Sequence, residues 1–186
     1  MSPTLIFSLV VLFFVVVIPI GIYNGLVSRR NAVDNSFASL DANLQKRFDL
    51  VPNLVAAVKG YMGHERETLE ELTRLRSQGQ SGSPGERLEA DGQISQALRH
   101  VMFTAENYPQ LRASENFNQL QRTLVELEEQ ISASRRSFNA AVTDYNTSIQ
   151  AFPGSVFASM FGFAHRDLFA ITNDAARVAP NLTGQF

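Results

Sequence analysis

Two patterns of hydrophobic residues divide the chain. The first stretch begins at Leu5 and ends at Ile22, is almost entirely Leu, Ile, Val and Phe, and contains no charged residue. As a helix, roughly 18 residues rising 1.5 Å each span about 27 Å, close to the hydrocarbon thickness of a bilayer. Pro19 is tolerated in a membrane helix, at the cost of a kink. The pattern predicts a transmembrane anchor within residues 1–25.

A cleaved secretory signal is the alternative interpretation of this stretch. Such a signal needs a basic leader and a cleavage site made of small residues. The leader here carries no side-chain charge, and the residues after Ile22 are Tyr23, Asn24, Gly25 and Leu26. We therefore expect an anchor that is not cleaved.

The orientation of the anchor follows from its flanking charges. Arg29 and Arg30 lie just after the span, and no basic side chain precedes it. The positive-inside rule then predicts that the N-terminus lies outside and the rest of the chain in the cytoplasm. The chain would then cross the inner, cytoplasmic membrane once.

After the anchor the pattern becomes periodic, with apolar residues three or four positions apart, typical of a long helix in a bundle or coiled coil. The series is Val33, Phe37, Leu40, Leu44, Phe48, Val51, Val55, Val58, Met62, Leu69 and Leu72. Pro52 predicts either a kink or a stop at Leu50 with a new segment after it. The Gly- and Ser-rich residues 76–86 predict a loop, and residues 86–103 a shorter helix.

A second long stripe follows Ser114, a good N-cap, and ends at Pro153 and Gly154. It comprises Phe117, Leu120, Leu124, Leu127, Ile131, Phe138, Val142, Tyr145, Ile149 and Phe152. Two stripes of similar length predict an all-α fold in which two long helices lie antiparallel, with shorter helices covering part of the groove. This bundle would occupy residues 26–153.

Residues 154–186 form a tail that is unusually rich in Phe. Such a run is rarely left in water. One interpretation is a short helix folded back on the bundle. The alternative is a contact surface for a neighbouring subunit or for the membrane interface. We predict that an oligomer contact is made by Phe157, Phe161, Phe163 and Phe169.

Composition narrows the possible partners and chemistry. The net charge is −2, so no basic excess points to nucleic acid. The chain has no Cys and therefore no disulfide or thiolate metal site. His64-Glu65 begins like a zinc-protease helix, but Thr68 stands where the second His is required. The sequence predicts no catalytic, metal or cofactor site.

Several polar residues lie close to the apolar stripes of the two long helices, and we interpret them as contacts between these helices. Asp49 on the first long helix is expected opposite Arg135 on the last, so we predict that Asp49 pairs with Arg135 or Arg136 and fixes the register. A buried ligand site among these polar residues is the alternative. The other residues of this set are Arg47, Asn53, Lys59, Glu128, Asn139 and Asn146.

Several stretches resemble the bacterial LemA family. The resemblance covers about residues 23–163 and rests on Tyr23-Asn24, Lys46-Arg47-Phe48-Asp49-Leu50-Val51-Pro52-Asn53-Leu54-Val55, Val58-Lys59-Gly60-Tyr61, His64-Glu65, Glu106-Asn107-Tyr108-Pro109, Arg135-Arg136 and Tyr145-Asn146. Phe138 departs from the family, in which Tyr is usual. The resemblance implies one N-terminal membrane helix and an antiparallel helical bundle, and it implies no reaction.

The sequence thus predicts a membrane-anchored, non-enzymatic helical scaffold that self-associates into a homo-oligomer. Anchored copies share one plane, which raises their effective concentration for weak lateral contacts. An adaptor for another membrane protein, such as a membrane protease, is the alternative. An enzyme is the third possibility, without a supporting motif.

Overall fold

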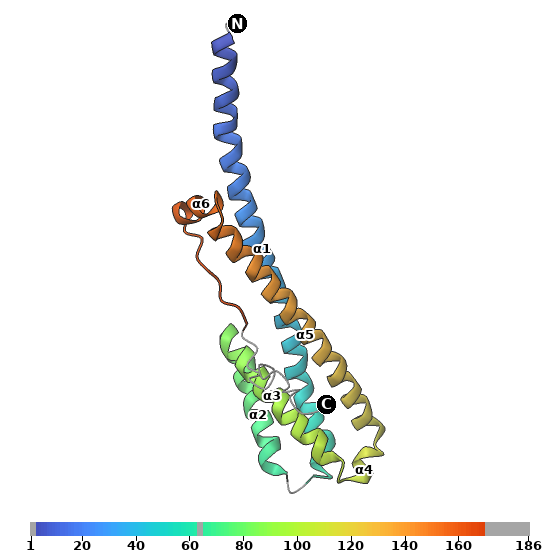
Figure 1. Cartoon of the computed structure of the whole chain (residues 1–186). Coiled ribbons are helices and arrows are strands. Elements are labelled where there is room, and N and C mark those ends of the chain that lie inside the picture. The colour runs from blue at the N-terminus through green and yellow to red at the C-terminus, as the bar shows by residue number, and fades with distance from the viewer. Residues whose placement is uncertain (1–2, 63–64, 170–186) are drawn as a thin grey trace, which may run out of the picture. The chain divides into compact units, whose positions relative to one another are not determined.

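The structure is a computed structural model that describes residues 3–62 and 65–169, and these residues form helices without any strand. In chain order the helices are α1 (Pro3–Lys59), α2 (Arg66–Ser81), α3 (Pro84–Ala105), α4 (Pro109–Arg112), α5 (Glu115–Gln150) and α6 (Gly154–Phe161) (Figure 1). The predicted all-α fold with two long helices is confirmed.

The packing divides the chain into two compact units. The first unit contains residues 1–33 and 138–186, and the second contains residues 34–137. Both long helices contribute to both units, because the division falls within α1, after residue 33, and within α5, before residue 138. Each unit has its own buried core.

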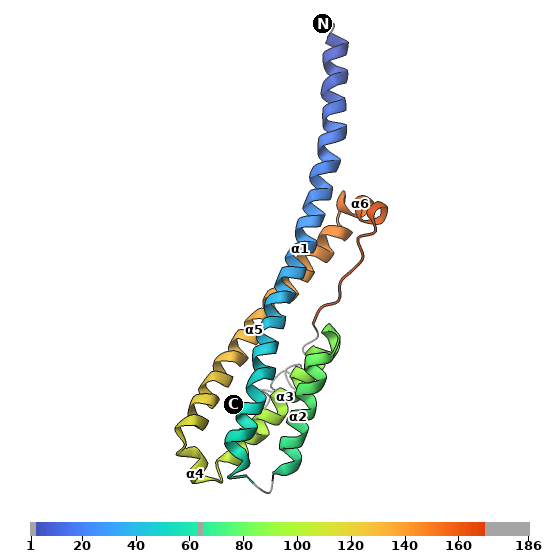
Figure 2. The same cartoon turned by 180° about the vertical axis from the view of Figure 1, so that it is seen from behind.

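The second unit is a helical bundle. Its α2 and α3 lie side by side in both views (Figures 1 and 2) and pack closely together. Apolar side chains from all five helices that enter this unit fill its core, among them Leu40, Leu44, Phe48, Leu72, Leu75, Ile94, Val101, Leu111 and Ile131. The periodic positions singled out in the sequence are therefore mostly core positions.

The first unit joins the N-terminal half of α1 to the end of α5 and to α6. Its core consists of Leu26, Val33, Val142, Tyr145, Ile149 and Ala158, with Phe138, Phe157 and Phe163 packed against it. After α6 a non-helical segment continues to residue 169, the last one described. The tail from residue 170 onward lies outside the described residues.

The two long helices pair in antiparallel fashion within each unit. In the first unit Arg29 of α1 bonds to Asp144 of α5, at 2.9 Å. In the second unit Asn43 of α1 bonds to Ser134 of α5, also at 2.9 Å. Later residues of α1 thus meet earlier residues of α5, as the matching stripes predict.

Two boundaries differ from the sequence predictions. The predicted loop over residues 76–86 is wrong in extent, since α2 continues to Ser81 and α3 begins at Pro84. The Ser83 backbone N–H donates to the Glu86 carboxylate at 2.7 Å, and Pro84 occupies the first turn, where its missing N–H costs nothing. Helix α1 runs unbroken through Pro52, and the stripe beyond Met62 belongs to α2.

Candidate functional site

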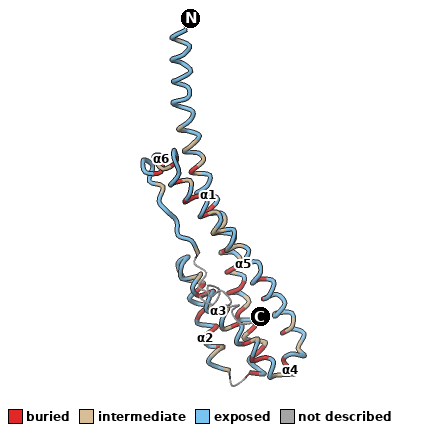
Figure 3. Tube along the Cα trace, in the orientation of Figure 1, coloured by how far each residue is buried: buried red, intermediate tan, exposed pale blue. Residues whose placement is uncertain are grey.

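The longest run of exposed apolar side chains among the described residues lies along the N-terminal part of α1. Between Ile6 and Ile20 every large hydrophobic side chain that is described is exposed, and Figure 3 shows this segment almost entirely in the exposed colour. The helix is long and apolar enough to cross a membrane. Both predicted limits, Leu5 and Ile22, lie within α1.

A buried charge network lies in the second unit and begins at Arg47 of α1. The Arg47 side chain is 1% exposed, and its Nη1 lies 2.7 Å from Asp91 Oδ1 of α3 and 2.5 Å from Ser95 Oγ. Its Nη2 bonds to the Glu128 carboxylate of α5. One guanidinium group thereby links three helices.

Asp91 is the second centre of this network. Its side chain is fully buried, and it also accepts a hydrogen bond from Arg135 of α5. Burial raises the pKa of Asp91, and this effect outweighs the Arg47 and Arg135 charges, which lower it. The network, defined here as Arg47, Asp91, Ser95, Glu128 and Arg135, contains two positive and two negative groups.

The network's chemistry suits the selection of one packing arrangement. A buried ion pair gains little net stability because its desolvation cost is large. Leaving Arg47 or Asp91 unpaired in the core is costly, however, so helix registers that separate these two groups are disfavoured. We predict that the network sets the register of the helices.

The predicted partners Asp49 and Arg135 each bind another group. Asp49 accepts hydrogen bonds from Gln45 at 2.9 Å and from Gln80 at 3.2 Å. Arg135 binds Asp91, and Arg136 donates to Ser132 at 2.9 Å. The reason is the register of α1 against α5, which places Asn43, not Asp49, at the level of Ser134.

Sequence reasoning missed Asp91, although a signal was present. Asp91, Ile94, Leu98 and Val101 follow the same three- and four-residue spacing and are all buried. When a carboxylate occupies one position of an otherwise apolar three- and four-residue repeat, it indicates that a buried partner of opposite charge is present.

A second group of polar side chains lies on α5 in the first unit and binds the non-helical segment 164–169, called the strap here. Asn146 Oδ1 accepts from the Arg166 N–H at 3.0 Å, and its Nδ2 donates to the Arg166 carbonyl at 2.7 Å. Asn139 makes the same two bonds to Phe169, at 2.8 and 3.1 Å. Tyr145 donates its hydroxyl hydrogen to the Ala164 carbonyl at 2.9 Å.

The spacing of these side chains explains the fit. Asn139 and Asn146 are two helical turns apart, about 10.5 Å along the axis. Three residues of extended chain, from Arg166 to Phe169, cover about 10 Å at ~3.3 Å each. The two amides are therefore spaced to hydrogen-bond the backbone groups of Arg166 and Phe169, and these bonds do not involve the side chains of the strap.

The four Phe residues predicted as an oligomer contact make contacts within the chain. Phe157 and Phe163 are half-buried against the core of the first unit, and the Phe161 ring lies 4.9 Å from that of Tyr23. The Phe169 backbone is held by Asn139. An oligomer contact through these residues stays a prediction.

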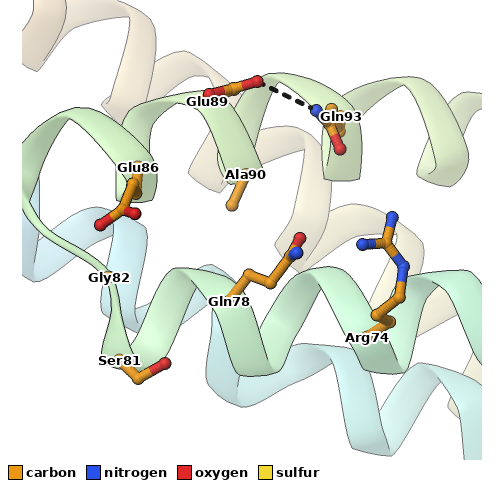
Figure 4. Close-up of a pocket in the computed structure, with 8 residues that line it drawn as sticks. All are labelled: Arg74, Gln78, Ser81, Gly82, Glu86, Glu89, Ala90 and Gln93. Carbon is orange, nitrogen blue, oxygen red and sulfur yellow. Dashed lines mark hydrogen bonds between the residues drawn. The ribbon is translucent and has the colours of Figure 1, made fainter.

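A polar groove of about 460 Å³ lies between α2 and α3. Figure 4 shows Arg74 and Gln78 of α2 pointing toward α3 and Ala90 of α3 pointing toward α2, and Glu89 and Gln93 lie along α3. The Arg74 guanidinium is bonded to Glu71 at 2.7 Å, and the Gln93 amide donates to Glu89 at 3.5 Å. The groove offers hydrogen-bonding groups without an arrangement of nucleophile and base.

Within residues 3–62 and 65–169, no group of three His, Cys, Asp or Glu side chains could hold a metal ion. Glu65 lies 3.7 Å from His100 Nε2 as an isolated pair. The predicted half-motif at His64 lies outside the described residues.

Comparison with known proteins relates the chain to one family. The LemA family model matches residues 36–183. Magnetosome protein MamQ 2 of Paramagnetospirillum magneticum is 24% identical over 174 residues, covering 79% of this chain and 64% of the relative. Protein LemA of Metamycoplasma hominis is 28% identical over 153 residues, covering 76% and 68%. The chain thus spans just under two thirds of the length of MamQ 2.

Proposed function

The chain belongs to the LemA family, and from this premise we propose that it is a membrane-anchored, non-enzymatic helical scaffold that self-associates at the bacterial cell envelope. The observation that carries the proposal is the continuity of α1, whose exposed apolar stretch passes without a break into positions buried in both units. One helix therefore serves as both anchor and bundle element. One relative, MamQ 2, is a magnetosome protein.

The distribution of polar groups supports a structural role over a catalytic one. The buried charges of the network are bonded to one another, and the amides of Asn139 and Asn146 are bonded to the strap. Catalytic sites instead present polar groups to a cavity that substrate can enter.

Membrane extraction tests the anchor. We expect the 186-residue chain to stay in the membrane pellet after alkaline carbonate washing, and a variant lacking residues 3–22 to appear in the soluble fraction. Release of the intact chain by carbonate would contradict the proposed span.

Cross-linking in native membranes tests self-association and the adaptor alternative. A ladder of multiples of one chain supports the scaffold. A single band containing a different protein supports the adaptor and counts against self-association.

The proposed orientation is tested at Ser39, an exposed residue of α1. Because the chain contains no Cys, Ser39→Cys creates a unique thiol. An impermeant thiol reagent should leave it unlabelled in intact cells and label it after permeabilisation. Labelling in intact cells would reverse the topology.

A further inference from the structure

Helix α6 has one side packed on the protein and another that is exposed and apolar. Gly154 and Ala158 are buried, and Phe157 packs against the core of the first unit. On the other side Val156 is 49% and Met160 70% exposed, one turn apart, and Phe152 just before the helix is 84% exposed. No part of residues 3–62 and 65–169 covers this surface.

The same segment is free of charge. Residues 151–164 contain no Asp, Glu, Lys, Arg or His, although charged and ionisable residues resume at His165, Arg166 and Asp167. The outer side of α2, by comparison, carries the exposed ion pairs Arg66–Glu70 and Arg74–Glu71. A helix in a membrane interface buries its apolar side at the boundary between headgroups and acyl chains, and the exposed side of α6 has no charge that would oppose such burial.

The position of α6 along α1 identifies the surface that it meets. The Phe161 and Phe163 rings lie 4.9 and 5.8 Å from the ring of Tyr23, the residue directly after the proposed span. Aromatic side chains gather at the level where a transmembrane helix leaves the hydrocarbon. In Figure 1, α6 lies beside α1 where the bare N-terminal stretch ends.

Two basic residues come after Tyr23 along α1, farther from the proposed membrane span. Arg30 lies over the Phe163 ring, 5.5 Å from its centroid, and Arg29 is one residue earlier. These residues are seven and eight positions beyond Ile22, about 10 to 12 Å along the helix, a depth that long basic side chains reach at the phosphate layer.

We infer that α6, together with Phe152 and Tyr23, is an interfacial helix whose exposed apolar side lies in the headgroup region of the same bilayer that α1 crosses. This inference rests on the proposed anchor. The occupant of the surface is phospholipid, because the surface continues directly from the lipid-facing part of α1. A second copy of the chain is the competing occupant, and the experiment separates the two.

The chain has no Trp, so one introduced Trp reports on a single position. Met160→Trp is reconstituted in phosphatidylcholine/phosphatidylglycerol vesicles with or without brominated acyl chains. We expect a blue-shifted emission that loses intensity when the lipid is brominated. Phe103→Trp is the matched control, because Phe103 is an equally exposed residue of α3, at 70%, and its emission should stay unchanged.

A third variant, Val11→Trp, reports on the span independently of α6. Quenching at Val11 without quenching at Met160 would overturn the inference and leave the anchor intact. Loss of quenching at both positions would overturn both. A blue shift at Met160 that ignores bromine and disappears on dilution with lipid would identify a second copy as the occupant and overturn the inference.

Discussion

At the scale of single residues, we expect the carboxylate of Asp91 to contribute more to packing specificity than the exposed carboxylate of Asp144. The Asp91 carboxylate is fully buried between two guanidinium groups, whereas Asp144 pairs with Arg29 in an exposed position. The same ion-pair chemistry thus occurs in two environments, and burial decides what each pair contributes.

Asp91→Asn should lower the free energy of unfolding by about 3 kcal/mol, because it removes the buried carboxylate that binds both Arg47 and Arg135 and leaves the buried Arg47 guanidinium with Glu128 alone. Chemical denaturation of the detergent-solubilised chain, followed by circular dichroism, measures the loss. Asp144→Asn is the matched control and should cost less than about 1 kcal/mol. Equal losses in the two variants would contradict the register-setting role of Asp91.

Gly79 allows α2 to approach α1 closely. A Cβ atom at this position would lie 2.5 Å from Cζ of the Phe48 ring, which is buried and cannot move aside without disturbing the core. Gly79→Ala should therefore destabilise the protein by about 1–3 kcal/mol through overpacking.

Gly92 provides the control for this substitution. A Cβ there meets nothing within 4 Å, and the residue lies within α3. Gly92→Ala should raise the free energy of unfolding by roughly 0.5–1 kcal/mol, since Ala restricts the unfolded chain and favours helix. Opposite signs in the two thermal melts are the expected result, and equal signs would contradict the close approach.

At the scale of elements, α1 shows how a helix passes through a proline. Pro52 has no N–H, so the Phe48 carbonyl four residues earlier loses its helical partner. The Arg76 side chain of α2 supplies a replacement, with Nε donating to that carbonyl at 3.0 Å. The interruption in one helix is thereby compensated by its neighbour.

A double-mutant cycle tests this compensation. In the wild-type background Arg76→Ala should cost about 1–2 kcal/mol, because the Phe48 carbonyl is left without a partner. In a Pro52→Ala background the helix can supply its own N–H, and the same substitution should cost clearly less. Additive effects in denaturation experiments would show that the two residues act independently.

Periodicity predicted the elements well and their contacts poorly. The 3–4 spacing located both long helices, because it records which side of a helix is buried. It could not exclude a helix over residues 76–81, since Ser and Gln are permitted there once Leu72 and Leu75 are anchored in the core. The pairing of Asp49 required the helix register, which depends on long-range contacts that the local pattern does not contain.

The strap illustrates the same limit. Asn139 and Asn146 were recognised as polar residues near the seam, but their partners are backbone groups some 20 to 30 positions away. Backbone N–H and C=O groups do not depend on the type of side chain, so the sequence does not indicate which of them an asparagine will bind. The signal in the sequence is the two-turn spacing of Asn139 and Asn146, with Tyr145 beside them, which places three hydrogen-bonding side chains on α5 where one segment of chain can bind.

A double substitution tests the asparagine contacts. Asn139→Ala with Asn146→Ala removes four hydrogen bonds to the strap and should increase hydrogen exchange at residues 164–169. Asn43→Ala removes the bond to Ser134 in the other unit and serves as the control. Unchanged exchange in the double variant would show that Tyr145 and the Phe contacts hold the strap by themselves.

At the scale of the whole molecule, the two units have separate cores although they share α1 and α5. Proteins open locally in cooperative groups, and such groups follow the packing of side chains more than the continuity of the backbone. A defect placed in one core should therefore loosen that unit first, even though both long helices continue into the other.

Two substitutions of identical chemistry test this separation. Leu26 is buried in the core of the first unit and Leu72 in that of the second. Leu→Ala at either position should cost about 2–5 kcal/mol through lost burial and the cavity left behind. Hydrogen exchange read by mass spectrometry should rise across residues 138–169 in Leu26→Ala and across α2 and α3 in Leu72→Ala. If either variant instead raised exchange equally in residues 138–169 and in α2 and α3, the two units would unfold as one cooperative group. A defect in the first unit would then destabilise the second unit as well.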